Sequence, residues 1–310
     1  MTTADMNSRA GAPASVPVLD GIAGLVSGYD VILSDIWGVV HNGRQHFAAA
    51  CDALARFRQR GGTVILITNA PRPYPPVLKQ LEGLGVPGGT FDAVVTSGDV
   101  TLSLIAAHDG APLHHIGPPR DIALFDILTE QTGLNPPRVG LDTAEYVVCT
   151  GLFDDEHTPD DYADAFRIMR ARNLSMISAN PDIVVHVGEK ELYCSGALAE
   201  VYEKMGGTVI QAGKPFAPIY GKAMELAASK FGRAVEPARV LAIGDGMRTD
   251  IAGAASRGLD VIFVTSGIHR AQLHPPGPDG APGELRRDVL DRIAAEAGLS
   301  PLAAMAQLAW

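Results

Sequence analysis

Five polar residues stand at or just after the ends of apolar runs, where the chain leaves a predicted strand. Asp35, Thr68 and Lys214 each occupy such a place, and Asp245 and Asp250 stand five positions apart after another run. A strand-end carboxylate can act as a nucleophile, as a metal ligand or as both. The acidic pair suits Mg²⁺, while the hydroxyl and the ammonium suit phosphate oxygens. Together they predict in-line attack by Asp35 on a phosphoryl group, followed by hydrolysis of the aspartyl-phosphate.

Neighbouring residues extend this predicted site. Asn69 and Ala70 follow Thr68 and offer an amide side chain and loop N–H groups, which are donors that a phosphoryl group needs. Asn180 and Asp182 stand in a Ser-Ala-Asn-Pro-Asp run and are interpreted either as residues that shape a turn or as substrate-side residues. The predicted substrate-binding set is Thr68, Asn69, Ala70, Asn180, Asp182 and Lys214.

The spacing of apolar residues predicts a series of strand and helix units around a parallel sheet. Ligands of open α/β sheets bind at the carboxyl ends of the strands, which is where the polar residues stand. Two amphipathic helices are expected near the C-terminus, one around 285–293 and one over 301–310. The predicted strands are 31–35, 64–68, 93–96, 146–149, 176–178, 183–186, 209–213, 240–245 and 261–264.

Charge and composition narrow the classes of partner. The chain has 310 residues, with 25 Lys plus Arg against 35 Asp plus Glu and a net charge of −10. Such a chain repels nucleic acid and anionic lipid unless a basic patch intervenes, and we find no such patch. No apolar stretch approaches the ~20 residues of a membrane span. We therefore expect neither nucleic acid nor a membrane as a partner.

Cysteine usage and the N-terminus indicate the compartment. Cys51, Cys149 and Cys194 are far apart and odd in number, which suits neither a disulfide framework nor a zinc site. Residues 1–17 are rich in Ala, Ser, Thr and Pro and hold no apolar run of signal-peptide length. We expect a cytoplasmic protein with a disordered tail over residues 1–17.

In order and spacing the reactive segments resemble the four motifs of the haloacid dehalogenase superfamily, which are a strand-end Asp, a Ser or Thr, a Lys and an acidic pair. The segments 96–97, 178–182, 195–197 and 213–215 look like its class IIA, which includes the N-acetylglucosamine-operon, nitrophenyl and pyridoxal phosphatases. The resemblance covers nearly the whole chain. It implies an α/β fold with a Rossmann-like parallel sheet core and an inserted α/β cap.

The resemblance also implies domain bounds and residue roles. The discontinuous core would comprise 18–118 and 206–310, and the cap 119–205. Asp35 would be the nucleophile, Asp245 a direct ligand of Mg²⁺ and Asp250 a support for it. The function implied is that of a Mg²⁺-dependent phosphatase acting on a small phosphorylated metabolite such as a sugar phosphate, a nucleotide or pyridoxal phosphate.

One position departs from the family pattern. Phosphatases of this superfamily usually carry a second Asp two residues after the nucleophile, and this chain has Trp37 there. That Asp protonates the leaving oxygen and later activates water, a role worth ~10²–10⁴-fold in rate, and indole can do neither. The metal contact at this position would come from the backbone carbonyl of Trp37, which any residue supplies.

Three explanations of Trp37 are open from the sequence. The substrate has a good leaving group, another residue serves as the acid, or turnover is weak and the protein binds or regulates through a phosphate site. His41 is the candidate for the acid, because its ordinary pKa suits that role, although a histidine before Asn-Gly more often makes a local hydrogen bond. Oligomeric state is also open, with the cap and the C-terminal helices as the surfaces through which a homodimer would form.

Overall fold

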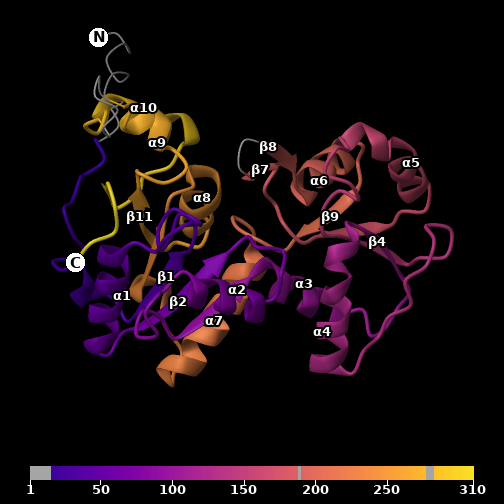
Figure 1. Cartoon of the computed structure of the whole chain (residues 1–310), viewed down its shortest axis with the longest axis horizontal. Helices are drawn as coiled ribbons and strands as arrows, with labels where there is room; N and C mark the ends of the chain where they lie inside the picture. The colour runs from indigo at the N-terminus through magenta and orange to yellow at the C-terminus, as the bar shows by residue number, and fades with distance from the viewer. Residues whose placement is uncertain (1–14, 188–189, 277–282) are drawn as a thin grey trace, which may run out of the picture.

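The computed structural model describes residues 15–187, 190–276 and 283–310, which form two α/β units lying side by side (Figure 1). One unit, the core, is built on a six-stranded sheet in the order β12-β11-β10-β1-β2-β3, with every neighbouring pair parallel. Its strands are β1 (Val31–Asp35), β2 (Thr63–Thr68), β3 (Ala93–Thr96), β10 (Val240–Gly244), β11 (Asp260–Val264) and β12 (Ala303–Met305). The predicted parallel sheet core is confirmed.

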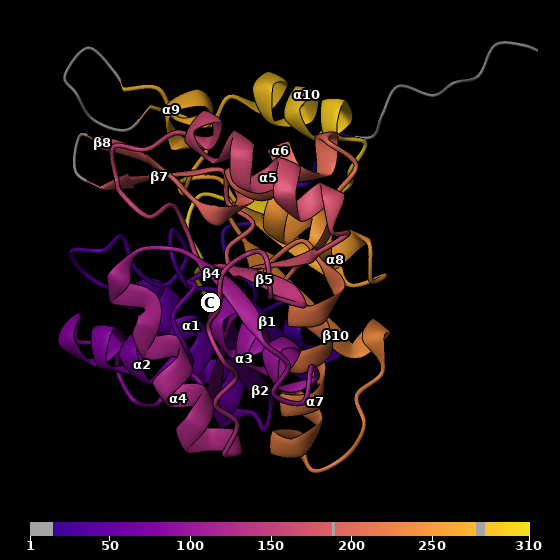
Figure 2. The same cartoon turned by 90° about the vertical axis from the view of Figure 1, so that its right-hand side faces the viewer.

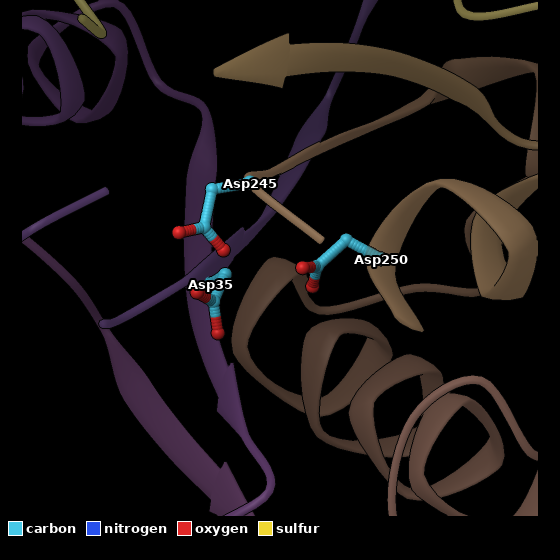
Figure 3. Close-up of side chains that lie close together, drawn as sticks. All are labelled: Asp35, Asp245 and Asp250. Atoms are coloured by element: carbon cyan, nitrogen blue, oxygen red, sulfur yellow. The ribbon is translucent and has the colours of Figure 1, made fainter. Parts of the chain in front are cut away.

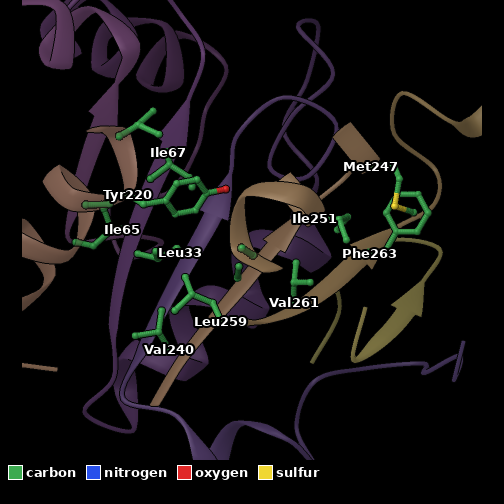
Figure 4. Close-up of a cluster of buried hydrophobic side chains, with 14 of the residues drawn as sticks. Leu33, Ile65, Ile67, Tyr220, Val240, Met247, Ile251, Leu259, Val261 and Phe263 are labelled. Carbon is green, nitrogen blue, oxygen red and sulfur yellow. The ribbon is translucent and has the colours of Figure 1, made fainter. Parts of the chain in front are cut away.

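Helices cover both faces of the core sheet, so its central strands are buried and read as continuous apolar runs. On one face Leu33 and Ile65 of the sheet pack in the same apolar cluster as Tyr220 and Ile251, as Figure 4 shows. On the other face the sheet packs against α1 and α2. The core helices are α1 (Ala48–Gln59), α2 (Tyr74–Gly83), α3 (Ser97–Ala106), α7 (Ala217–Phe231), α8 (Ala252–Ala255), α9 (Arg270–Leu273) and α10 (Arg287–Ala297).

The second unit, the cap, has a four-stranded parallel sheet in the order β4-β5-β6-β9. Helices α5 and α6 pack on one face of it, and α4 packs on the other. A separate antiparallel hairpin, β7 with β8, extends from the cap toward α9 of the core in both views (Figures 1 and 2). The cap elements are β4 (Leu113–Ile116), α4 (Ala123–Thr132), β5 (Tyr146–Cys149), α5 (Ala163–Ala171), β6 (Ser175–Ser178), β7 (Val184–Val187), β8 (Lys190–Tyr193), α6 (Ser195–Lys204) and β9 (Thr208–Gln211).

Helix α3 joins the two units. Val100 belongs to the apolar cluster under the core sheet, whereas Leu102 and Ile105 belong to the cluster under the cap sheet. One helix therefore buries two faces against two different sheets. This shared packing fixes the cap sheet beside the carboxyl ends of the core strands.

The sheet pairing corrects the implied domain bounds. Strands β4 and β9 lie outside the implied cap of 119–205, yet both pair in the cap sheet. The cap sheet thus runs from Leu113 to Gln211, and the predicted strand over 209–213 belongs to the cap and not to the core. The error has a physical reason, because short buried parallel strands have the same apolar composition in either sheet.

The two ends of the chain also differ from expectation. The predicted helix over 301–310 is wrong, since β12 pairs parallel with β11 at the edge of the core sheet. Its three residues are all buried, so they lack the polar side that an amphipathic helix needs. At the other end, residues 1–14 of the predicted tail lie outside the described residues. The remaining part is packed, because Val16 is buried and its N–H donates to Asp291.

No helix in the described parts of the chain is both long and apolar enough to cross a membrane.

Candidate active site

The carboxyl ends of three neighbouring strands of the core sheet meet at one place. Asp35 is the last residue of β1, Thr68 is the last residue of β2, and Asp245 directly follows β10. These strands are neighbours in the order β10-β1-β2, so their parallel pairing brings the three side chains to one edge of the sheet. The structure therefore confirms the predicted convergence of strand-end residues.

Three carboxylates form the centre of this site. Asp35, Asp245 and Asp250 each offer one oxygen atom, and these oxygens lie within 4.8 Å of one another. All three residues are buried, and Figure 3 shows their carboxylates turned toward a common point. Such a group of hard oxygen donors fits a divalent cation of the Mg²⁺ type.

Lys214 supplies the positive charge that the sequence predicted. Its Nζ donates hydrogen bonds to Asp35 and, at 2.7 Å, to Oδ1 of Asp250. The second oxygen of Asp250 accepts from the N–H of Gly246 at 3.0 Å. Asp250 is thus a direct partner of the lysine as well as a member of the carboxylate cluster, and its predicted support role for a metal stays a prediction.

Burial and mutual charge set the ionisation of this cluster. Burial raises the pKa of Asp35 well above its ordinary range. The positive charge of Lys214 lowers this pKa, and the negative charges of Asp250 and Asp245 raise it further. Burial and the charge of Asp250 raise the pKa of Asp245 to about 7. Burial works to lower the pKa of Lys214, but Asp250 and Asp35 outweigh it and raise that pKa. Three carboxylates facing one ammonium leave an excess of negative charge, which a divalent cation would neutralise.

The backbone of two glycines packs closely against the carboxylate of Asp245. A Cβ built on Gly38 would lie 1.9 Å from Oδ2 of Asp245, and a Cβ on Gly267 would lie 2.0 Å from the same atom. The N–H of Ile268 donates to that oxygen at 2.8 Å. The loop of Gly267 and Ile268 was not among the predicted site residues. The signal present was a Ser-Gly pair shortly after the strand over 261–264.

Asn69 positions the backbone of Lys214. Its Oδ1 accepts from the N–H of Lys214 at 2.7 Å, and its Nδ2 donates to the carbonyl of Lys214 at 3.2 Å and to Asp182 at 2.9 Å. Both polar atoms of the side chain are therefore engaged inside the protein. Of its two predicted neighbours, Thr68 accepts at its hydroxyl oxygen from the N–H of Ala70 at 3.3 Å, and no residue that the structure describes accepts the Thr68 hydroxyl proton.

The cap contributes Asp182 to this network. Asn180 shapes the turn, because its Oδ1 accepts from the N–H of Asp182 at 3.0 Å and its backbone bonds to Ser195. Asp182 in turn accepts from Asn69 of the core. The sequence left open a turn role and a substrate-side role. The structure shows the turn for Asn180 and a bond between cap and core for Asp182.

Trp37 and His41 lie on the loop after β1. Trp37 is an exposed side chain, whereas His41 is buried and its Nδ1 accepts from the N–H of Gly43 at 3.0 Å. Burial lowers the pKa of His41. The local hydrogen bond expected of a histidine before Asn-Gly is therefore present, and a buried neutral ring is a poor source of a proton for catalysis.

Two family profiles and a solved structure are similar to this chain. The profile of the haloacid dehalogenase-like hydrolases matches residues 32–128, and a second profile, described as HAD-hydrolase-like, matches residues 211–291. A solved hydrolase of the haloacid dehalogenase-like family from Brucella suis 1330 is 43% identical, with a TM-score of 0.76. That similarity covers 94% of this chain and 99% of the Brucella chain.

Two curated relatives carry names of phosphatases. The 5'-nucleotidase YutF of Bacillus subtilis is 26% identical over 247 residues, which are 79% of this chain and 90% of that protein. The D-glycerol 3-phosphate phosphatase of Mycobacterium tuberculosis is 30% identical over 251 residues, which are 78% of this chain. The chain spans 65% of the length of the mycobacterial protein.

Proposed function

The chain belongs to the haloacid dehalogenase-like hydrolases, and we propose that it is a Mg²⁺-dependent phosphatase of a small phosphorylated metabolite with Asp35 as its nucleophile. Phosphatase-named relatives support the class of reaction, that of a phosphoric monoester hydrolase. The observation that carries the proposal is the cluster of Asp35, Asp245 and Asp250 around the ammonium of Lys214. In-line phosphoryl transfer through an aspartyl-phosphate needs a carboxylate nucleophile beside cationic charge, and the cluster provides both.

Each residue of the cluster has a task in this proposal. Asp35 attacks the phosphorus, and the resulting aspartyl-phosphate is hydrolysed by water. Lys214 and the free hydroxyl proton of Thr68 stabilise the phosphate oxygens as charge develops on them. Asn69 contributes by holding the backbone of Lys214 in place, so that the ammonium does not have to be ordered during the reaction.

The carboxylate cluster fits a bound Mg²⁺. Asp35 and Asp245 would hold the ion with Asp250 in support, and the backbone carbonyl of Trp37 is proposed as a further ligand. When bound, Mg²⁺ would supply Lewis-acid stabilisation of the phosphate charge. The glycine walls of Gly38 and Gly267 keep the Asp245 carboxylate beside the other two, because any side chain there would displace it.

The direct test is a phosphate-release screen. Wild-type protein is expected to release phosphate from at least one substrate among sugar phosphates, glycerol phosphate, nucleotides, pyridoxal phosphate and nitrophenyl phosphate when Mg²⁺ is present. Chelation by EDTA is expected to reduce the rate to background, and added Mg²⁺ to restore it. Rates at background with Mg²⁺ on every substrate would favour a phosphate-binding or regulatory protein instead.

A substitution at Gly267 is expected to weaken Mg²⁺ binding. The new Cβ of Gly267→Ala would lie 2.0 Å from Oδ2 of Asp245, so the carboxylate must turn away from the cluster. We expect the rise in Tm that Mg²⁺ causes in the wild type to shrink by more than half at the same Mg²⁺ concentration. Gly28→Ala is the matched control, because nothing lies within 4 Å of a Cβ there. An equal rise in Tm with Mg²⁺ in both variants would contradict the role of Gly267 in holding the Asp245 carboxylate.

A further inference from the structure

A turn of the cap carries Asp182 to the active site. The turn follows β6, which pairs parallel with β9, and Lys214 follows shortly after the end of β9. Both residues therefore stand at the carboxyl edge of the cap sheet, on neighbouring strands. The NH₂ group of Asn69 donates to the carbonyl of Lys214 at 3.2 Å and to Oδ1 of Asp182 at 2.9 Å. The carboxyl group of Asp182 thus lies beside the main chain of the lysine.

Close packing fixes this turn. A Cβ on Gly196, in the first turn of α6, would lie 2.5 Å from the carbonyl oxygen of Asp182. A Cβ on Gly213, the residue before the lysine, would lie 2.6 Å from Cδ of Pro181. The N–H of Asp182 donates to Oδ1 of Asn180 at 3.0 Å. The main chain of Asp182 is therefore ordered before a substrate binds, which lowers the entropy cost of using its side chain in a reaction.

One oxygen of Asp182 is open to a further partner. Among the side chains that the structure describes, Asn69 is the one donor to this carboxyl group, and it binds Oδ1. Burial raises the pKa of Asp182 above its ordinary value, although the hydrogen bond from Asn69 and the charge of Lys214 both lower it. The charge of Asp250 raises it further. Burial thus favours the protonated form, in which Oδ2 is a hydrogen-bond donor.

Asp182 also lies on the side of the site where a leaving oxygen is expected. In-line attack places the leaving oxygen on the side of the phosphorus opposite Asp35. Asp245 and Asp250 belong to the same core cluster as Asp35, so they lie with the attacking carboxylate. Asp182 comes from the cap, which lies beside the core (Figure 1), and it is close enough to Lys214 and Asp250 to feel their charges. It is therefore the carboxyl group placed to face a leaving oxygen.

We propose, on the basis of the phosphatase function proposed above, that Asp182 of the cap is the catalytic acid and base of the reaction. It takes the role that the indole of Trp37 cannot fill and that the buried ring of His41 is poorly suited to fill. Of the three explanations of Trp37, this is the one in which another residue serves as the acid. The cap then supplies a reacting group to the site.

The two steps balance in atoms, electrons and protons. A carboxylate oxygen of Asp35 bonds to phosphorus while the bond from phosphorus to the ester oxygen breaks. The electron pair of that bond stays on the ester oxygen, which takes the proton from Oδ2 of Asp182. A water oxygen then bonds to phosphorus and gives one proton to the Asp182 carboxylate, and the electron pair of the bond between phosphorus and Asp35 returns to Asp35. Both carboxyl groups end as they began.

The test compares a leaving group that needs a proton with one that does not. The alkoxide of propyl phosphate is a poor leaving group, whereas the nitrophenolate of nitrophenyl phosphate leaves as a stabilised anion. Asp182→Asn keeps an oxygen that can accept from Asn69 but has no carboxyl proton to give. It is expected to lower kcat/KM for propyl phosphate ~10²–10⁴-fold and kcat/KM for nitrophenyl phosphate less than ~10-fold.

A second readout follows from the lost base. In Asp182→Asn the first step on nitrophenyl phosphate stays fast, while hydrolysis of the aspartyl-phosphate slows. Release of nitrophenolate is therefore expected to show a burst of about one equivalent per active site, measured by stopped-flow absorbance. Trp37→Asp in the Asp182→Asn background is expected to recover propyl phosphate hydrolysis at least ~10-fold, because it restores a carboxyl group at the position that is usual in the family.

Two controls separate acid chemistry from positioning. Asn69→Ala removes the bonds to Lys214 and Asp182 but keeps the carboxyl group, so it is expected to lower kcat/KM for both substrates alike. Asp164→Asn on α5 makes the same change at an exposed carboxylate that pairs with Arg167, and it is expected to stay within ~2-fold of wild type on both substrates.

The outcomes distinguish this inference from the proposed function. An equal loss on both substrates in Asp182→Asn, or no loss on propyl phosphate, overturns the assignment of Asp182 and leaves the phosphatase intact. Wild type that hydrolyses nitrophenyl phosphate but no alkyl phosphate overturns it as well, because such an enzyme has no working acid. Absence of phosphate release from every substrate in wild type refutes the phosphatase itself.

Discussion

Asp35→Asn is expected to lower Mg²⁺-dependent phosphate release at least ~10⁴-fold, because the amide cannot form the bond to phosphorus. The fold is expected to survive, since Asn has the same shape and removes one of three mutually repelling carboxylates. The measurement is phosphate release under single-turnover conditions, with intact mass spectrometry to detect the phosphorylated protein after acid quenching. Thermal unfolding of the variant checks that it is folded.

Asp52→Asn is the matched control for this change. Asp52 lies on α1, is about half exposed and pairs with Arg56 at 2.8 Å. The same Asp-to-Asn change there removes a surface carboxylate that has no proposed role in the reaction. Its activity is expected to stay within twofold of wild type. If Asp35→Asn kept more than a tenth of the wild-type rate, Asp35 would not be the nucleophile.

Lys214→Met is expected to destabilise the protein by ~3–5 kcal/mol in the presence of EDTA. The change removes the ammonium that faces Asp35 and Asp250 and leaves those carboxylates buried without a cation. Activity is also expected to fall ~10²–10³-fold, because charge developing on the phosphate loses a donor. The free energy of unfolding from urea titration measures the first effect, and kcat the second.

The comparison for this prediction is Lys204→Met on α6. Lys204 pairs with Glu200 at 2.7 Å, but both side chains are at least half exposed, and such surface pairs contribute about 0–1 kcal/mol. A loss for Lys214→Met no larger than that of Lys204→Met would mean that the buried ammonium does not stabilise the cluster. Mg²⁺ is expected to recover part of the stability of Lys214→Met, because a divalent cation neutralises the same carboxylates.

One hydrogen-bonded side chain links the cap to the candidate active site of the core. Asn69 connects Lys214 of the site to Asp182 of the cap through the two ends of one amide. Movement of the cap would therefore displace Asn69, which holds the backbone of Lys214. We infer that cap position and lysine position are coupled through Asn69.

The sequence predicted the reactive residues because each stands at the end of a recognisable strand. The runs before Asp35, Thr68 and Asp245 are apolar enough to be read as buried parallel strands, and the carboxyl ends of such strands share one edge of a sheet. Lys214 was identified in the same way, although the strand before it belongs to the cap sheet. Local pattern was therefore sufficient to predict that these residues converge, but not to find the loop of Gly267 and Ile268.

The tertiary structure alone decided which sheet each strand joins and what each polar atom binds. The sequence of a short apolar strand does not indicate which strand it pairs with. The domain bounds and the edge strand β12 were therefore not predictable from local pattern. The pairing of Lys214 with both Asp35 and Asp250, and the engagement of Asn69 by Lys214 and Asp182, depend on contacts between distant segments. Sequence order determined that Trp37 stands two residues after Asp35. Only the tertiary structure decided that its indole packs against His41 and Gly43 and still stands exposed.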